Sequence, residues 1–172
     1  RREMPPRAAR PPVANPFSLL GKNWLVWRIG RAHLRSVAHL ARGRALDIGC
    51  GRMPMIPVFA GGIDRLIGLD RLRPEEPDRP VSVFGDARRL PFRSDSFDTA
   101  LCLQVLEHLP EPEESLREAC RVLRPGGHLI LTAPHIWNVH EAPDDYFRFT
   151  HYGLRHLFAK AGFEVVEVRA MA

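Results

Sequence analysis

Residues 44–51 read Arg-Ala-Leu-Asp-Ile-Gly-Cys-Gly, and this stretch decides the fold. Its apolar residues make a short strand, and Gly49 and Gly51 then remove the side chains where the chain must turn sharply. Pro54 follows at a position that suits the first turn of a helix. The unit therefore predicts a strand, a glycine turn and a helix, with a ligand pocket over the turn. An ordinary strand that ends in a glycine turn is the alternative interpretation.

The length and composition predict one globular domain. A chain of 172 residues can bury a real core but is small for two domains. No apolar run approaches the roughly 20 residues of a membrane helix, and no signal peptide is visible. The three cysteines form no Cys-x-x-Cys pair, which argues against a disulfide framework or a structural zinc site. We therefore expect a cytoplasmic protein with reduced thiols.

The positive charge lies at the start of the chain. Residues 1–44 carry ten Lys and Arg and one acid, whereas residues 45–172 carry fifteen Lys and Arg against nineteen acids. The mildly acidic main part makes a nucleic-acid partner a poor expectation. Residues 1–16 are rich in proline and arginine and read as a flexible basic arm. Helical spacing over 17–43 predicts a cap or lid, with peripheral contact to anionic lipid through 17–42 as the sharper alternative.

Residues 44–172 alternate between strand and helix patterns. We expect strands over 44–48, 65–70, 81–84, 96–103, 128–133 and 163–168, and helices over 111–123 and 151–161. This alternation predicts an open, mostly parallel, doubly wound sheet of the Rossmann-like α/β class with helices on both faces. Asp70 and Asp86 each stand at a strand end, where one can accept from ribose hydroxyls and the other from an adenine amino group. Either acid could instead cap a helix.

Five motifs then stand in the order and spacing of one enzyme family. They read Leu-Asp-Ile-Gly-Cys-Gly at 46–51, Gly-Leu-Asp at 68–70, Gly-Asp-Ala at 85–87, Phe-Asp-Thr-Ala-Leu-Cys-Leu-Gln-Val-Leu-Glu-His-Leu at 97–109 and Arg-Val-Leu-Arg-Pro-Gly-Gly-His-Leu-Ile-Leu at 121–131. Each is weak alone, but together, over roughly residues 40–170, they resemble class I S-adenosylmethionine-dependent methyltransferases. The resemblance is closest to the small bacterial type 11 group.

The resemblance implies S-adenosylmethionine as the cofactor and gives roles to matching residues. The methionine part of the cofactor would lie on Asp47, Gly49 and Gly51, and its ribose on Asp70. Its adenine would lie by Asp86 and Ala87, and the floor of the binding site would be formed by Leu103 and Gln104. Two departures stand out. Met53 occupies the position where the family usually has a third glycine, and the family's antiparallel seventh strand is missing before Ala172.

The segment 133–150 follows the fifth expected strand and is similar to a stretch in methyltransferases of surface-polysaccharide and lipid-linked sugar pathways. A loop of this length at the carboxyl edge is expected to form the wall that binds the acceptor, a small molecule or a saccharide. Its candidate residues, with one residue from the preceding motif, are Glu107, His140, Asp144, Tyr146 and Arg148. The alternative is a structural loop in which Arg148 pairs with Asp144 or Asp145.

Methyl transfer from a sulfonium is an in-line displacement that needs alignment, exclusion of water and sometimes removal of a proton from the acceptor. His135 is the first candidate base and His108 the second, because imidazole titrates near working pH. Two other interpretations are a nicotinamide-dependent Rossmann oxidoreductase and a binding protein that keeps the fold without catalysis. The missing third glycine and the later motifs argue against the oxidoreductase.

Gln104, Glu107 and His108 fall at i, i+3 and i+4, a spacing that places side chains on one helical face. Some relatives have Glu, Glu and His there and add a later histidine, which His135 would match, to bind a divalent ion. Gln104 replaces the first carboxylate, and a neutral amide weakens a site for a hard cation. A softer ion on Glu107, His108 and His135 is the alternative. We expect no bound metal.

Overall fold

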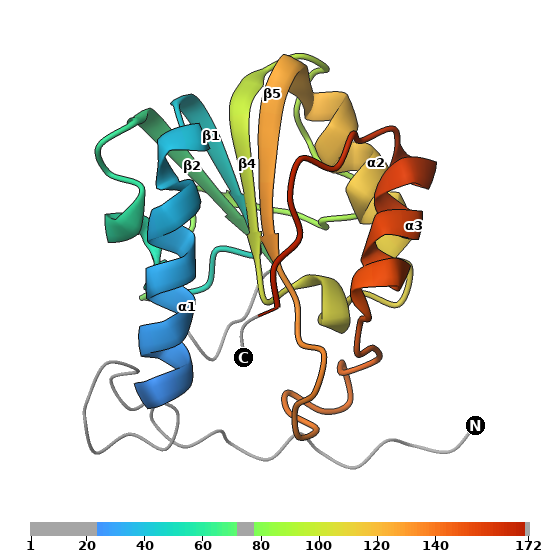
Figure 1. Ribbon diagram of the computed structural model, residues 1–172. Helices are drawn as coiled ribbons and strands as arrows, with labels where there is room; N and C mark the ends of the chain where they lie inside the picture. Colours follow the sequence, from blue (N-terminus) through green and yellow to red (C-terminus); the bar gives the residue numbers. More distant parts are fainter. Residues whose placement is uncertain (1–23, 72–77, 171–172) are drawn as a thin grey trace.

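The computed structural model describes residues 24–71 and 78–170 (Figure 1). In chain order its elements are α1 (Trp24–Val37), the 3-10 turn η1 (Ala38–Leu40), β1 (Gly43–Ile48), η2 (Ile56–Val58), β2 (Ile63–Asp70), β3 (Val83–Phe84), β4 (Phe97–Leu103), η3 (Leu106–His108), α2 (Pro112–Val122), β5 (Leu123–Thr132) and α3 (His151–Ala161). The strands form one sheet in the order β3-β2-β1-β4-β5, and every neighbouring pair is parallel. The strand order changes direction between β1 and β4, which is where ligands bind in open sheets of this class. The predicted parallel α/β sheet is confirmed.

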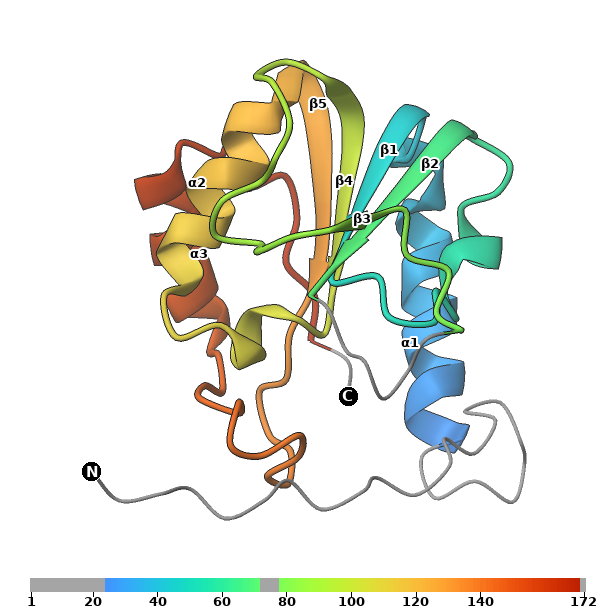
Figure 2. The ribbon, with the colours of Figure 1, turned by 180° about the vertical axis from the view of Figure 1, so that it is seen from behind.

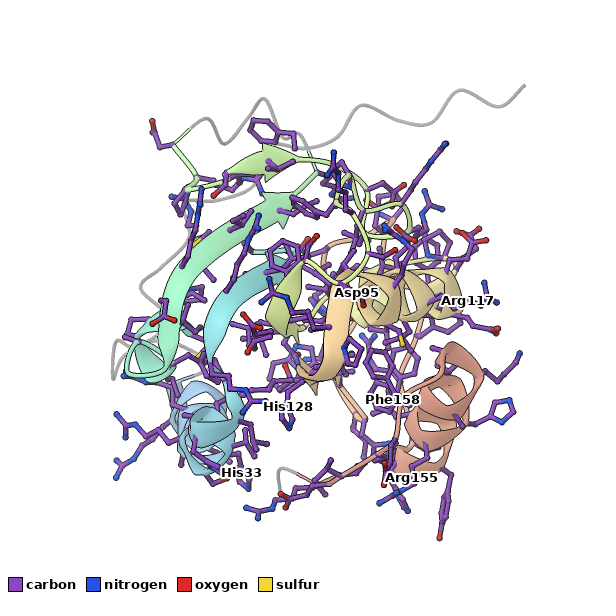
Figure 3. The ribbon with its side chains drawn as sticks, turned by 90° about the horizontal axis from the view of Figure 1, so that it is seen from above. His33, Asp95, Arg117, His128, Arg155 and Phe158 are labelled. Carbon is purple, nitrogen blue, oxygen red and sulfur yellow. The ribbon has the colours of Figure 1, made fainter. Side chains whose placement is uncertain are left out.

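Helices cover both faces of the sheet, as the alternation predicts. Leu34 of α1 packs with Leu101 of β4 and Ile130 of β5 on one face. Leu46 of β1 belongs to the other core cluster, together with Val122 of α2. Figure 2 shows α1 and α2 at opposite sides of the sheet, and the view from above places His33 of α1 across from Arg117 of α2 and Phe158 of α3 (Figure 3). The apolar alternation of the strands therefore makes a core on each face of the sheet, and a third cluster around Leu116 and Ala161 joins α2 to α3.

The two helices after β4 begin and end where their sequences predict. Pro112 lies in the first turn of α2, and Arg121 lies in its last turn, in agreement with the helix dipole. The Thr150 hydroxyl accepts a hydrogen bond from the Gly153 amide at the start of α3. Gly162 ends α3 in the left-handed conformation, with φ of 91°. Both helices were predicted to within one residue at each end.

Two expected elements are wrong. The helix after the glycine turn is only the 3-10 turn η2, because Pro57 lacks a backbone N–H and the chain reaches β2 at Ile63. Residues 163–168 form no strand. Their apolar alternation is real, since Phe163 packs against the core, but Val166 is 77% exposed. Alternation indicates which side chains share a face, whereas a strand also needs backbone pairing with β5, and this pairing is not made.

The start of the chain is described only in part. The expected arm of residues 1–16 and the first residues of the expected cap lie outside the described residues. The helix predicted within 17–43 appears as α1, followed by η1. Within the described ranges, no helix is long and apolar enough to cross a membrane.

We expect α1 to be part of the folded core, because Leu34 is only 5% exposed and packs against the sheet. Leu34→Ala should lower the free energy of unfolding by about 2–4 kcal/mol through lost burial and the cavity it leaves. Arg35→Ala, at an exposed position one residue later, is the control and should change it by less than about 0.5 kcal/mol. Denaturant unfolding measures both. Equal effects of the two variants would contradict the packing role of α1.

Candidate active site

The glycine turn after β1 leaves open space at the carboxyl edge of the sheet. Gly49 and Gly51 both have positive φ, at 69° and 50°. A Cβ on Gly49 would lie 2.5 Å from a methyl carbon of Val105, so the turn can pack there only without a side chain. A Cβ on Gly51 would meet nothing within 4 Å. The turn therefore leaves open space next to Gly51 that a ligand can fill, and we call this space the cradle over Gly51.

The Asp70 carboxylate ties this turn to the end of β2. Its Oδ2 atom accepts hydrogen bonds from the Gly51 amide at 2.8 Å and from Arg79 Nη1 at 2.7 Å. Its Oδ1 atom accepts from the Arg71 amide at 2.7 Å. The Arg79 and Asp70 side chains are only 3% and 10% exposed. Asp70 therefore lies where the sequence predicts, and its charge is compensated by a buried arginine.

Arg79 is the residue that sequence reasoning missed. It lies in a proline-rich stretch with no motif, so only the fold could bring it to Asp70. A carboxylate has about four lone-pair positions, and three of those on Asp70 are in use. One ribose hydroxyl can therefore bond to Asp70 as it stands, and a second one needs Arg79 to move.

A long groove runs from this edge along β5 to the opposite end of the sheet, and it is lined, among other residues, by seven of the eight predicted cofactor residues: Gly49, Gly51, Asp70, Asp86, Ala87, Leu103 and Gln104. Asp47 does not line it and is only 4% exposed within β1. Burial, together with the charge of Asp70, raises the pKa of Asp47 to about 7. Asp47 is therefore not a lining side chain of the groove.

The predicted adenine end is more exposed. Arg88 donates to both carboxylate oxygens of Asp86 and holds the pKa of Asp86 below its usual range. The same guanidinium pairs with Glu111. Ala87 is buried in the core. On the floor of the groove, Gln104 has φ of 59°, an uncommon conformation for a residue with a side chain and one that sequence alone does not predict.

Glu107, His108 and His140 come together, and the two histidines line the same groove. Each offers a side-chain nitrogen or oxygen, and these atoms all lie within 4.8 Å of one another. Glu107 is fully buried, and neither of its carboxylate oxygens has a hydrogen-bond partner among the described residues. Burial raises the pKa of Glu107 to about 7. Sequence spacing placed Glu107 beside His108, but the fold adds His140 to this group in place of His135.

His108 is fixed in one tautomer. Its Nδ1 atom lies 2.6 Å from the Asp144 backbone oxygen, and because a carbonyl only accepts, Nδ1 carries the proton. The Nε2 atom is then an acceptor and lies 3.8 Å from a Glu107 oxygen. Burial lowers the pKa of His108, which keeps the ring neutral and able to accept a proton.

The loop 133–150 forms the wall on this side. Arg148 pairs with both oxygens of Asp145, at 2.7 and 2.8 Å, which is the structural pairing named as the alternative. Asp144 pairs instead with Arg71, at 2.6 Å. The Tyr146 amide donates to the Glu107 carbonyl oxygen. His135 is exposed, and its described side-chain hydrogen bond joins Nδ1 and the Phe149 carbonyl oxygen.

Comparison with known proteins decides the family. The family model described as "Methyltransferase domain" matches residues 46–131, which include the glycine turn, Asp70 and the Glu107–His108 pair. The chain is a methyltransferase-domain protein. The sequence prediction of the family is therefore confirmed, and the family and fold imply S-adenosylmethionine as the cofactor.

Individual relatives agree with the family. This methyltransferase domain is 36% identical over 104 residues to the 27-O-demethylrifamycin SV methyltransferase of Amycolatopsis mediterranei, covering 53% of this chain and 38% of that one. It is 34% identical over 110 residues to the phosphatidylethanolamine N-methyltransferase of Cereibacter sphaeroides, covering 56% and 54%. A solved S-adenosylmethionine-dependent methyltransferase of Thermotoga maritima shares the fold with a TM-score of 0.63 and 26% identity, covering 83% of this chain and 75% of that one.

The match is to part of the relatives only. The chain spans between about a third and about half of the length of these two curated relatives. Within the methyltransferase domain the cradle over Gly51 and the acceptor oxygens of Asp70 fit the implied cofactor. Met53, where the family usually has glycine, keeps a glycine-like backbone, with φ of 53°.

We expect Glu107 to make the stability of the methyltransferase domain fall with pH. Between about 4.5, the ordinary value, and about 7, the folded protein holds a proton on Glu107 that the unfolded chain has lost. The free energy of unfolding should therefore decrease as pH rises through this range and level off above it. Asp47, whose pKa is also raised to about 7, contributes a similar loss, so Glu107→Gln should remove only the share of Glu107 and stabilise the protein at pH 8 by roughly 3 kcal/mol, with little change at pH 4.

Thermal unfolding across pH measures this effect, and Glu164→Gln, at an exposed position, is the control and should leave the pH profile unchanged. A Glu107→Gln protein that is less stable than the original at pH 8 would contradict the interpretation, because it would show that a cation compensates the carboxylate.

Proposed function

We propose that this chain transfers a methyl group from S-adenosylmethionine to a small-molecule, saccharide or lipid-linked acceptor by in-line displacement. One observation carries the proposal: the cradle over Gly51 with Asp70 beside it, and the acceptor wall with His108, line one groove at the same edge of the sheet. The family favours this function over a nicotinamide oxidoreductase or a non-catalytic binding protein. When bound, the cofactor supplies a methyl group on a positively charged sulfur.

The residues of the chain align the partners and exclude water. Gly49 and Gly51 let the backbone approach the methionine part, Asp70 accepts from the ribose, and Leu103 and Gln104 form the floor. Asp86 and Ala87 flank the adenine end. We assign α1 the role of a cap over one face of the sheet.

His108 is the proton acceptor that the geometry favours, ahead of His135. The Asp144 carbonyl oxygen holds the proton on Nδ1, so the Nε2 atom of His108 carries a lone pair. Nε2 lies 3.8 Å from Glu107, whose carboxyl oxygens accept no hydrogen bond from the described residues. Nε2 accepts a hydrogen bond, and the Glu107 carboxyl group accepts as well once it has lost its proton, so the pair leaves a position for a group that donates, such as an acceptor hydroxyl or ammonium. The relatives act on different acceptors, as the names rifamycin and phosphatidylethanolamine indicate, so the acceptor atom stays open.

S-adenosylhomocysteine, the product form of the cofactor, should bind to the chain in a calorimeter. Asp70→Ala should weaken this binding by about 1–3 kcal/mol, because charge-assisted bonds to the ribose are lost. Asp64→Ala, at the exposed start of the same strand, is the matched control and should bind as the original protein does. Asp70→Asn keeps the size of the side chain in case the alanine variant is unstable. Unchanged affinity in a folded Asp70 variant would exclude the proposed ribose contact.

We expect the Glu107–His108–His140 group to act without a metal, since Gln104 lacks the carboxylate that a hard cation needs and Asp144 already holds His108 Nδ1. Protein purified without chelator should contain far less than one equivalent of metal by elemental analysis. Near-stoichiometric zinc, iron or nickel that is lost in His140→Ala would overturn this expectation, with His33→Ala as the histidine control on α1.

A further inference from the structure

Glu107 is a buried acid whose oxygens receive no donor from the described chain. Its side chain is 0% exposed, and neither of its carboxyl oxygens accepts a hydrogen bond from the described residues. Arg148 is the arginine whose charge acts on Glu107, but its two terminal nitrogens donate to the two oxygens of Asp145. A buried acceptor without a donor is costly, so it marks a position where a donor from outside the chain is expected.

Two histidines beside Glu107 add further acceptors. His108 Nδ1 lies 2.6 Å from the Asp144 carbonyl oxygen, and His140 Nδ1 lies 3.2 Å from the Asn138 carbonyl oxygen. Because a carbonyl oxygen only accepts, each Nδ1 atom carries the proton and each Nε2 atom carries a lone pair. Both side chains line the groove, so a ligand that enters from the groove meets two Nε2 atoms in front of the buried carboxylate of Glu107.

The three side chains are close enough to share one ligand atom. The turn η3 carries Glu107 and His108, and it meets the loop after β5, which carries His140, at the carboxyl edge of the sheet (Figure 1). One side-chain oxygen or nitrogen of each residue lies within 4.8 Å of the other two. For three atoms placed in this way, a point exists within about 2.8 Å of each, which is a hydrogen-bond distance. A single donor atom there can bond to all three.

The number of hydrogens on a donor decides which group fits best. A hydroxyl group has one hydrogen and can donate to one of the three acceptors, whereas a primary ammonium group has three and can donate to each. The positive charge of an ammonium group also favours the ionised form of Glu107, which burial disfavours. The positively charged sulfur of the cofactor has no hydrogen to donate. The three acceptors together therefore favour an ammonium group.

We propose that Glu107, His108 and His140 bind the ammonium group of the acceptor, so that the methyltransferase domain methylates a primary amine at nitrogen. His108 Nε2 takes one proton from the ammonium group, and the lone pair left on nitrogen forms a bond to the methyl carbon of S-adenosylmethionine. The carbon–sulfur bond breaks, and its electron pair stays on sulfur. The products are the protonated N-methyl amine and S-adenosylhomocysteine. This choice of acceptor rests on the proposed methyltransferase function.

Calorimetry with two probes of one skeleton tests the amine acceptor: benzylamine, which carries an ammonium group, and benzyl alcohol, which carries a hydroxyl group. At pH 8, the full chain saturated with S-adenosylhomocysteine should bind benzylamine at least about tenfold more tightly than benzyl alcohol. Glu107→Gln keeps the size of the side chain and should weaken benzylamine binding about tenfold or more, because the charge-assisted bond is lost. Glu164→Gln, at an exposed position, is the matched control and should bind both probes as the original chain does.

S-adenosylhomocysteine binding, measured on the same variants, separates the two proposals. A chain that prefers benzylamine but does not bind S-adenosylhomocysteine would keep the ammonium site and reject the proposed function. If S-adenosylhomocysteine binds, then equal binding of the two probes, or no binding of benzylamine, would overturn the amine acceptor alone. Unchanged benzylamine binding in Glu107→Gln would do the same. Weaker S-adenosylhomocysteine binding in Glu107→Gln would also overturn it, because the ammonium group held there would be that of the cofactor.

Discussion

The contact between Asp70 and the glycine turn is the interaction on which the site depends. Gly49 and Gly51 hold a left-handed backbone whose amide groups need acceptors, and the acceptors are the Leu69 carbonyl oxygen and the Asp70 carboxylate. The same carboxylate compensates the buried guanidinium of Arg79. Loss of Asp70 would remove a buried acceptor from the Gly51 amide and from the Arg79 guanidinium together, so the shape of the groove and the stability of this edge of the sheet both depend on this side chain.

Two buried acids, Asp70 and Asp47, lie under the turn and differ in their surroundings. Asp70 accepts three hydrogen bonds, one of them from a guanidinium. Asp47 lies deeper in β1, and both burial and the charge of Asp70 favour its neutral form near pH 7. Asp70 is the acid that lines the groove, where hydroxyl groups can donate to it. The two acids stand in two different motifs of the family, but only the structure shows that one lines the groove and the other is enclosed in β1.

The sequence predicts what depends on local pattern and misses what depends on distant contacts. Strand ends, the positions of Asp70 and Asp86 and the limits of α2 and α3 follow from apolar period, glycine and proline, and the structure agrees. Arg79 reaches Asp70 and His140 reaches His108 only because the fold brings separate loops together. The expected strand over 163–168 fails for the same reason, since pairing is a property of two segments and the alternation of one segment cannot specify it.

Met53 shows how a departure from the family pattern can leave the site intact. A residue with a side chain in the left-handed region costs about 1 kcal/mol relative to glycine. Its methyl carbon lies 2.1 Å from where a Cβ on Gly68 would stand, so the Met53 side chain occupies space that Gly68 of β2 leaves empty. Because the backbone still turns as glycine would, the substitution changes the packing beneath the turn, while the cradle above Gly51 keeps its open side for the cofactor.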